Sequence, residues 1–109
     1  MDKQNLSQKI KEQAAAVEER VIELRHQIHQ NPELSFAEKE TSALAAAEMK
    51  KLGFEIQENI FGTGVTATFK NSSDPGAKTL LIRADMDALP VEEKNELKFK
   101  SKNKGVMHA

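Results

Sequence analysis

Cysteine is absent from the 109 residues of this sequence, and this absence narrows the chemistry that the chain can perform. Without cysteine the chain forms no disulfide, and it offers neither a thiolate nucleophile nor a thiolate ligand for a metal. Any metal bound by these residues would have to be held by histidine, aspartate or glutamate.

The chain also lacks an excess of charge of either sign and a long apolar run. Sixteen basic and seventeen acidic residues leave a formal net charge of −1, which gives no electrostatic reason to expect nucleic acid or an anionic membrane as a partner. No apolar run reaches the ~18 residues of a transmembrane helix, and no secretory signal is visible. We therefore expect a cytoplasmic protein, and its length suits one domain at most.

Two helices are predicted in the first half of the chain. Apolar residues recur at the spacing of one helix face over roughly residues 5–30, and this helix should end near Asn31 because Pro32 follows. The positions are Leu6, Ile10, Ala14, Val17, Val21, Leu24 and Ile28. A second helix is predicted to start at a capping box formed by Ser35 and Glu38 and to end at Gly53.

About three strands are predicted after these helices. Alternating residues from Phe54 to Glu58 and a β-rich run over 65–69 flank a glycine-containing turn. Residues 79–84 are apolar without alternation, as expected for a strand covered on both faces. The predicted fold class is therefore α/β, and the end of this third strand is a candidate site because open α/β sheets bind ligands there.

Asp85 and Asp87 directly follow the third predicted strand, spaced so that both side chains point the same way. One interpretation is a metal ligand beside an acid that orients another ligand. The other is a turn in which the aspartates cap backbone amides and Arg83 pairs with one of them. Spacing alone favours the turn. His26 and His29 can share a helix face, a geometry that metals use, but packing is the commoner role.

Four segments, taken in order, resemble the opening of a family of metal-dependent amidohydrolases that includes hippurate hydrolases, N-acyl-amino-acid amidohydrolases and plant auxin-conjugate hydrolases. The segments are LRHQIHQNPELSFAEKET (24–41), TGVTATF (63–69), LLIRADMDALP (80–90) and GVMHA (105–109). The resemblance implies that residues 1–109 are the N-terminal part of a catalytic domain with a zinc-peptidase-like three-layer α/β/α fold, without the lid domain.

The resemblance also implies roles for individual residues. In the family the last segment continues into cysteine, glycine, histidine and aspartate, so the metal ligands fall outside this chain. Asp87 matches an aspartate that orients a ligand, and Asp85 stands where sister branches carry a metal-binding histidine, which implies that it lines the site. His108 matches a histidine just before the ligands. His29, Glu33 and Glu38 match positions that pack and cap the helix pair.

A complete family member would use two divalent ions, such as zinc or manganese, to activate water against the amide bond of an N-acyl amino acid. The isolated chain is expected to be inactive, and it should self-associate or partly unfold because it leaves a strand edge uncovered. The alternative hypothesis is a self-contained, non-catalytic α/β module that binds a partner through its first helix, whose spacing resembles a short coiled-coil seam.

Overall fold

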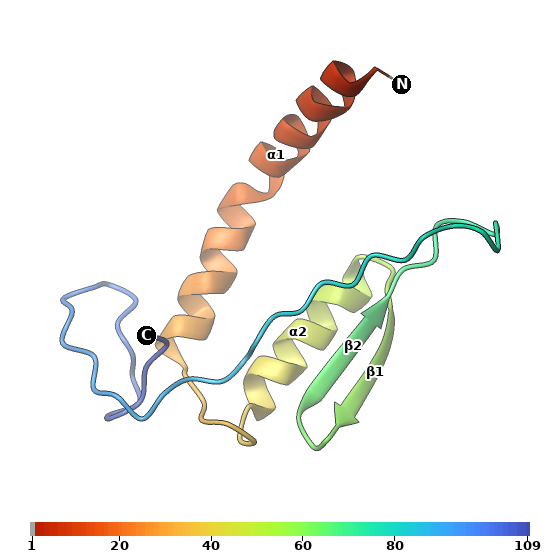
Figure 1. Ribbon diagram of the computed structural model, residues 1–109. Helices are drawn as coiled ribbons and strands as arrows, with labels where there is room; N and C mark the ends of the chain where they lie inside the picture. The colour runs from red at the N-terminus through yellow and green to blue at the C-terminus, as the bar shows by residue number, and fades with distance from the viewer. Residues whose placement is uncertain (1) are drawn as a thin grey trace.

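The computed structural model describes residues 2–109 and shows two helices followed by a two-stranded sheet (Figure 1). The elements are α1 (Lys3–Gln30), α2 (Lys39–Lys51), β1 (Glu55–Ile60) and β2 (Gly64–Thr68). The predicted α/β class and the order of helices before strands are confirmed. No helix in the described part of the chain is long and apolar enough to cross a membrane.

Helix α1 is long and stands away from the rest of the molecule over its first half (Figure 1). It ends at Gln30 as predicted, and the side chain of Asp2 accepts a hydrogen bond from the Gln4 amide at its start. None of its residues is buried, and Ile10 and Val21 on its apolar face are 60% and 55% exposed. Its second half contacts the remainder of the described chain, where Arg20 Nη2 forms an ion pair with Glu48 of α2 at 2.6 Å and the Gln30 carbonyl accepts a hydrogen bond from the Lys102 amide.

The start of helix α2 differs from the predicted capping box. The backbone turns at Phe36 with a left-handed φ of 64°, which takes Ser35 away from the helix start. The carboxylate of Glu33 caps the helix instead, because it accepts hydrogen bonds from the amides of Glu40 at 3.0 Å and Thr41 at 2.7 Å. Glu38 reaches back as predicted, but to the Phe36 amide at 2.6 Å and not to Ser35. The capping-box prediction was therefore wrong in its capping residue.

Helix α2 packs on the antiparallel hairpin of β1 and β2 through its alanine-rich face, where Ala46 is 6% exposed. The strands pair Ile56 with Ala67, and a register shift precedes the pairing of Ile60 with Gly64. A Cβ at Gly64 would lie 2.5 Å from the Ile60 carbonyl oxygen, so only glycine fits this close approach. The turn predicted between the first two strands is confirmed.

The third predicted strand, residues 79–84, does not form within the described part of the chain. Leu80, Leu81 and Ile82 are 83%, 89% and 82% exposed. The segment runs past α2 and the hairpin as an extended connection (Figure 1). The expectation of a strand covered on both faces was wrong for this chain, because a two-stranded sheet already packed on α2 offers nothing to cover it.

Residues 91–109 return to the C-terminal end of α1 (Figure 1). The amide of Lys102 donates to the Gln30 carbonyl at 2.9 Å, and Val106 is 8% exposed. This return places the end of the described chain beside the segment that follows α1.

Candidate functional site

Three of the four family-like segments meet at one junction near the end of α1. Leu34 and Ala88 form a parallel bridge, in which the Ala88 amide donates to the Glu33 carbonyl at 2.8 Å. Leu89 and Met107 form an antiparallel bridge with hydrogen bonds of 2.9 and 3.0 Å. Segments far apart in the sequence are thereby joined, and Asp87 and His108 each lie next to a bridged residue.

The two aspartates of the third segment have different surroundings. Asp85 Oδ1 forms an ion pair with Arg83 Nη2 at 2.8 Å, and the side chain of Asp85 is 64% exposed. This pairing agrees with the turn interpretation for Asp85. Asp87 is also exposed. Burial and the charge of His29 lower the pKa of His108, and the negative charge of Asp87 partly offsets this lowering. The structure therefore pairs Asp85 with Arg83, and it holds Asp87 next to Ala88 and Leu89, the residues that bridge Leu34 and Met107.

His108 has a buried nitrogen without a partner. Its Nε2 atom makes no hydrogen bond to any described residue, and its ring lies 6.5 Å from that of His29, measured between centroids. Burial lowers the pKa of His108, and the nearby His29 lowers it further. A neutral imidazole has one donor and one acceptor nitrogen, so Nε2 can bind a polar group that residues 2–109 do not supply.

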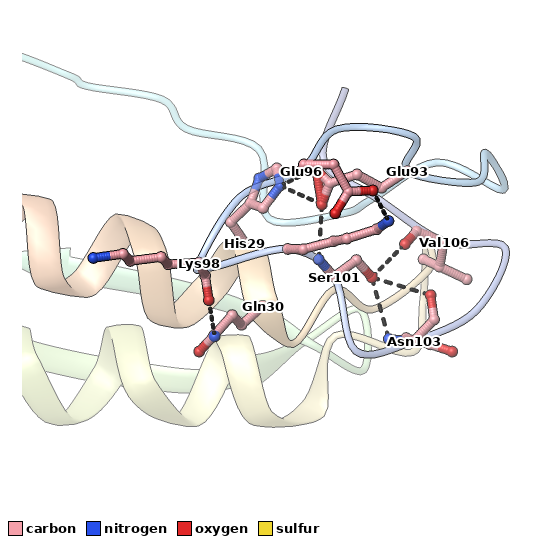
Figure 2. Close-up of polar contacts among 9 residues, drawn as sticks. His29, Gln30, Glu93, Glu96, Lys98, Ser101, Asn103 and Val106 are labelled. Atoms are coloured by element: carbon pink, nitrogen blue, oxygen red, sulfur yellow. Dashed lines mark hydrogen bonds and ion pairs between the residues drawn. The ribbon is translucent and has the colours of Figure 1, made fainter.

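A polar cluster of His29, Glu93, Ser101 and Val106 fixes this part of the chain (Figure 2). His29 Nε2 lies 2.9 and 3.0 Å from the two carboxylate oxygens of Glu93, and the Ser101 amide donates to Glu93 at 2.7 Å. The Ser101 hydroxyl lies 2.7 Å from the Val106 carbonyl oxygen. The cluster therefore connects the last turn of α1 to the residues immediately before His108.

Glu93 is the member of this cluster that sequence reasoning missed. It is 4% exposed, and its pKa is lowered by the hydrogen bond from the Ser101 amide and then by the contact with His29. It stands in a polar stretch without periodicity, so no spacing signal marks it as buried. The expectation that His29 serves the helix pair was also wrong, since its partner lies 64 residues further along the chain.

His26 is held by packing and not by a ligand-like contact. Its ring stacks on that of Phe99, with centroids 3.7 Å apart and an interplanar angle of 8°. The Arg25 guanidinium lies 5.7 Å from the centre of the Phe99 ring. His29 also contacts Phe99, edge-on with ring centroids 5.6 Å apart, and it contacts Glu93 as well. Among residues 2–109, no three histidine, aspartate or glutamate side chains gather closely enough to hold a metal ion, so the described residues do not by themselves fit a metal centre.

The capping and packing roles expected of Glu33 and Glu38 are confirmed by their contacts. Burial alone would raise the pKa of Glu33, but the hydrogen bonds from the Thr41 hydroxyl and from the amides at the start of α2 outweigh it and lower that pKa. Glu38 is buried and accepts a hydrogen bond from the Thr63 hydroxyl. This contact ties the hairpin turn, and with it the second family-like segment, to the start of α2.

Several known hydrolases are similar in sequence to this chain. No family model matches the sequence. Thermostable carboxypeptidase 2 of Saccharolobus solfataricus is 46% identical over 105 residues, which are 96% of this chain and 26% of the carboxypeptidase. Hippurate hydrolase of Campylobacter jejuni is 48% identical over 86 residues, which are 79% of this chain and 22% of the hydrolase.

A solved structure shows the same arrangement of elements. The Bacillus subtilis YXEP protein, a dinuclear metal-binding peptidase of the M20 family, superposes with a TM-score of 0.78 and 39% identity over 86% of this chain and 26% of its own. The chain spans about a quarter of the length of the curated relatives that it matches. Over nearly all of its length this chain is therefore similar, in sequence and in fold, to about a quarter of the length of hydrolases that include a dinuclear metal-binding peptidase of the M20 family.

Proposed function

We propose that residues 1–109 supply the N-terminal part of the catalytic domain of a metal-dependent amidohydrolase. The complete protein would cleave the amide bond of a small N-acyl amino acid and release a carboxylate and an amino acid. The observation that supports this most is the junction of Glu33 and Leu34 with Ala88, Leu89 and Met107, because it gathers the family-like segments at one place. A cytoplasmic location is part of the proposal.

Within this proposal Asp87 is a positioning residue and Asp85 lines the site. Asp87 is adjacent to the bridged Ala88, and Leu89 next along the chain bridges Met107, which supports a role for Asp87 in orienting the polypeptide around His108. Asp85 is exposed and paired with Arg83, which suits a residue at the edge of a site. The metal, which would be zinc, manganese or a similar divalent ion, would be held by residues of the complete protein outside 1–109.

The isolated chain is proposed to be inactive. The described residues contain no group of three metal-binding side chains, and hydrolysis assisted by a metal needs such a group. The uncovered apolar residues of 79–84 favour self-association of the isolated chain, because an unpaired strand edge readily accepts another strand.

The proposal is tested by comparing the isolated chain with a single polypeptide that joins it to the remainder of the Bacillus subtilis relative. The isolated chain should hydrolyse no N-acyl amino acid, and calorimetric titration with zinc or manganese should show no tight stoichiometric site. The joined polypeptide should hydrolyse members of a panel of N-acyl amino acids that includes hippurate. A tight site in the isolated chain would contradict the proposal, as would a folded, metal-loaded joined protein that cleaves none of the panel.

A further inference from the structure

The Ser101 hydroxyl connects two parts of the segment that leads to His108. It lies 2.7 Å from the Val106 carbonyl oxygen and 3.0 Å from the Asn103 carbonyl oxygen (Figure 2). A hydroxyl has one hydrogen to donate, and the shorter distance favours Val106 as its acceptor. Val106 is 8% exposed, so this hydrogen bond is shielded from water.

Ser101 is itself held by Glu93 and, through Glu93, by helix α1. The Ser101 amide donates to Glu93 Oε1 at 2.7 Å, and the same carboxylate lies 2.9 and 3.0 Å from His29 Nε2. An ionised carboxylate only accepts hydrogen bonds, so His29 Nε2 is the donor in this contact. Leaving either buried donor without its acceptor is unfavourable, and the carboxylate is therefore kept in one position. A continuous path of hydrogen bonds runs from α1 through Glu93 and Ser101 to Val106.

We propose that Ser101 is a positioning residue for the hydrolysis proposed for the complete protein, and that it acts by fixing the Val106 carbonyl and with it the polypeptide at His108. Met107, which lies between these two residues, is held only by its backbone pairing with Leu89 at 2.9 and 3.0 Å. The Ser101 hydroxyl is thus the side-chain contact nearest to His108 on this path. The inference rests on the proposed function, in which the polypeptide around His108 belongs to the site.

A single hydrogen bond of this kind affects geometry more than stability. Its net contribution to the unfolding free energy is small, because the same groups bond to water in the unfolded chain. A displacement of about 1 Å in a catalytic site, by contrast, can lower turnover by about 100-fold. Loss of the Ser101 hydroxyl should therefore change turnover without a matching loss of folded protein.

The test introduces Ser101→Ala into the polypeptide that joins this chain to the remainder of the Bacillus subtilis relative, loaded with manganese. With hippurate as substrate, kcat should fall by about tenfold or more while KM stays within about twofold, because bound substrate then meets a misplaced site. Deuterium exchange at the amides of 106 and 107 should accelerate by about threefold or more, a readout that does not depend on activity. Tm should fall by less than about 3 °C.

Ser101→Thr is the conservative variant, because it keeps a hydroxyl at the same position. It should return both kcat and the exchange rate to within about threefold of the parent values. Ser72→Ala is the matched control, since the Ser72 hydroxyl also bonds to one backbone group, the Asp74 amide at 3.1 Å, in the exposed segment after β2. It should leave kcat within about twofold of the parent value.

Glu93→Gln tests the same path from its other end, also when Ser101→Ala yields too little folded protein. The substitution replaces one carboxylate oxygen with an NH₂ donor, which cannot accept from His29 or from the Ser101 amide. kcat should fall here as well. The double variant should lie within about twofold of the more impaired single variant, because both substitutions break one path.

Parental kcat or an unchanged exchange rate at 106 and 107 in Ser101→Ala would overturn the inference. Equal losses in Ser101→Ala and Ser72→Ala, or additive losses in the double variant, would overturn it as well. A joined polypeptide that hydrolyses no N-acyl amino acid would contradict the proposed function, while faster exchange in Ser101→Ala that Ser101→Thr reverses would keep the fixing of Val106 by Ser101. An active parent with an equally active Ser101→Ala variant would keep the function and contradict the inference.

Discussion

His29 Nε2 lies 2.9 Å from one carboxylate oxygen of Glu93 and 3.0 Å from the other, although 64 residues separate the two in sequence. The side chain of Glu93 is 1% exposed and that of His29 is 12% exposed, so the pair is shielded from water. The contact fixes residues 91–108, which contain little regular structure, against the last turn of α1 (Figure 2). The placement of the last family-like segment therefore depends on this pair.

Glu93→Ala should destabilise the C-terminal half of the chain. The substitution leaves His29 Nε2 and the Ser101 amide without their common acceptor, and a buried polar group without a partner is unfavourable. We expect Tm to fall by at least about 5 °C and deuterium exchange at 101–108 to accelerate. The matched control is Glu96→Ala, because the Glu96 side chain is 92% exposed and lies 3.6 Å from Lys100. Equal changes in the two variants would contradict the assigned role of Glu93.

Stability should fall as the solution is made acidic. The pKa values of Glu33 and Glu93 lie below the ordinary 4.5 in the folded chain, so the unfolded chain binds more protons near that pH. The stabilisation is fully present above pH 4.5 and is lost as the pH falls through the lower folded values. Urea unfolding at several pH values from 7 to about 3 checks this slope. Glu93→Gln should show a shallower slope than the parent chain, and an unchanged slope would contradict the prediction.

Substitutions of Glu33 and Ser35 should differ in their effect on the stability of α2, because Glu33 caps the start of this helix and Ser35 does not. Since Glu33 accepts the amides of Glu40 and Thr41, Glu33→Ala should cost about 1 kcal/mol in unfolding free energy, the usual loss for a helix cap. Ser35→Ala should change it by no more than about 0.5 kcal/mol, because Ser35 is exposed and does not cap the helix. Urea unfolding of both variants measures the difference. A larger loss for Ser35→Ala would restore the capping box expected from the sequence.

Local features of the fold were predictable because they depend on neighbouring residues. The helical spacing from Leu6 to Ile28, the stop before Pro32 and the turn around Gly62 and Gly64 each need only short-range sterics and periodicity, and each is confirmed. The capping box failed because the backbone turns at Phe36 and the helix begins only at Lys39, where the Glu33 carboxylate accepts hydrogen bonds from the amides of Glu40 and Thr41. The sequence pattern alone does not show which of two acceptors reaches the helix start.

The long-range features were less predictable. Residues 79–84 are apolar as a covered strand should be, but burial depends on neighbours, and nothing in the described residues covers them. Glu93 was missed because its partner His29 is distant in sequence and neither residue lies in a pattern that links them. The family resemblance predicts that Asp85 and Asp87 lie beside a site, and the structure adds that Asp85 pairs with Arg83 while Asp87 is adjacent to the bridged Ala88.

Residues 79–84 and helix α1 can be separated as sources of self-association. Val17 is 53% exposed on the apolar face of α1, and Leu81 is 89% exposed in the extended segment 79–84. Sedimentation of the isolated chain should show that Leu81→Lys reduces association, because it places a charge in the unpaired segment. Val17→Asp should leave association unchanged, since the short seam of α1 is marginal for a coiled coil. A stable dimer that only Val17→Asp abolishes would favour the interaction-module hypothesis.

Asp87 and Asp85 should differ in their effect on catalysis in the joined polypeptide. Asp87→Asn should lower the hydrolysis rate or the metal affinity by about 10–100-fold, the usual effect of removing a carboxylate that orients metal-binding groups. Asp85→Asn should lower them by less than about tenfold, because Asp85 is exposed and forms a surface ion pair with Arg83. Initial rates on hippurate and calorimetric titration with manganese give the two readouts, with circular dichroism to confirm that both variants fold.

The metal affinity distinguishes a positioning role of Asp87 from a purely structural one. If Asp87 acts by orienting the polypeptide after His108, its loss should weaken metal binding or turnover while Tm changes by less than about 3 °C, because its exposed side chain contributes little packing. A large fall in Tm with unchanged turnover per folded molecule would make Asp87 structural. An effect of Asp85→Asn that exceeds that of Asp87→Asn would reverse the two roles, and it would point to Asp85 as the residue that contacts the metal or its ligands.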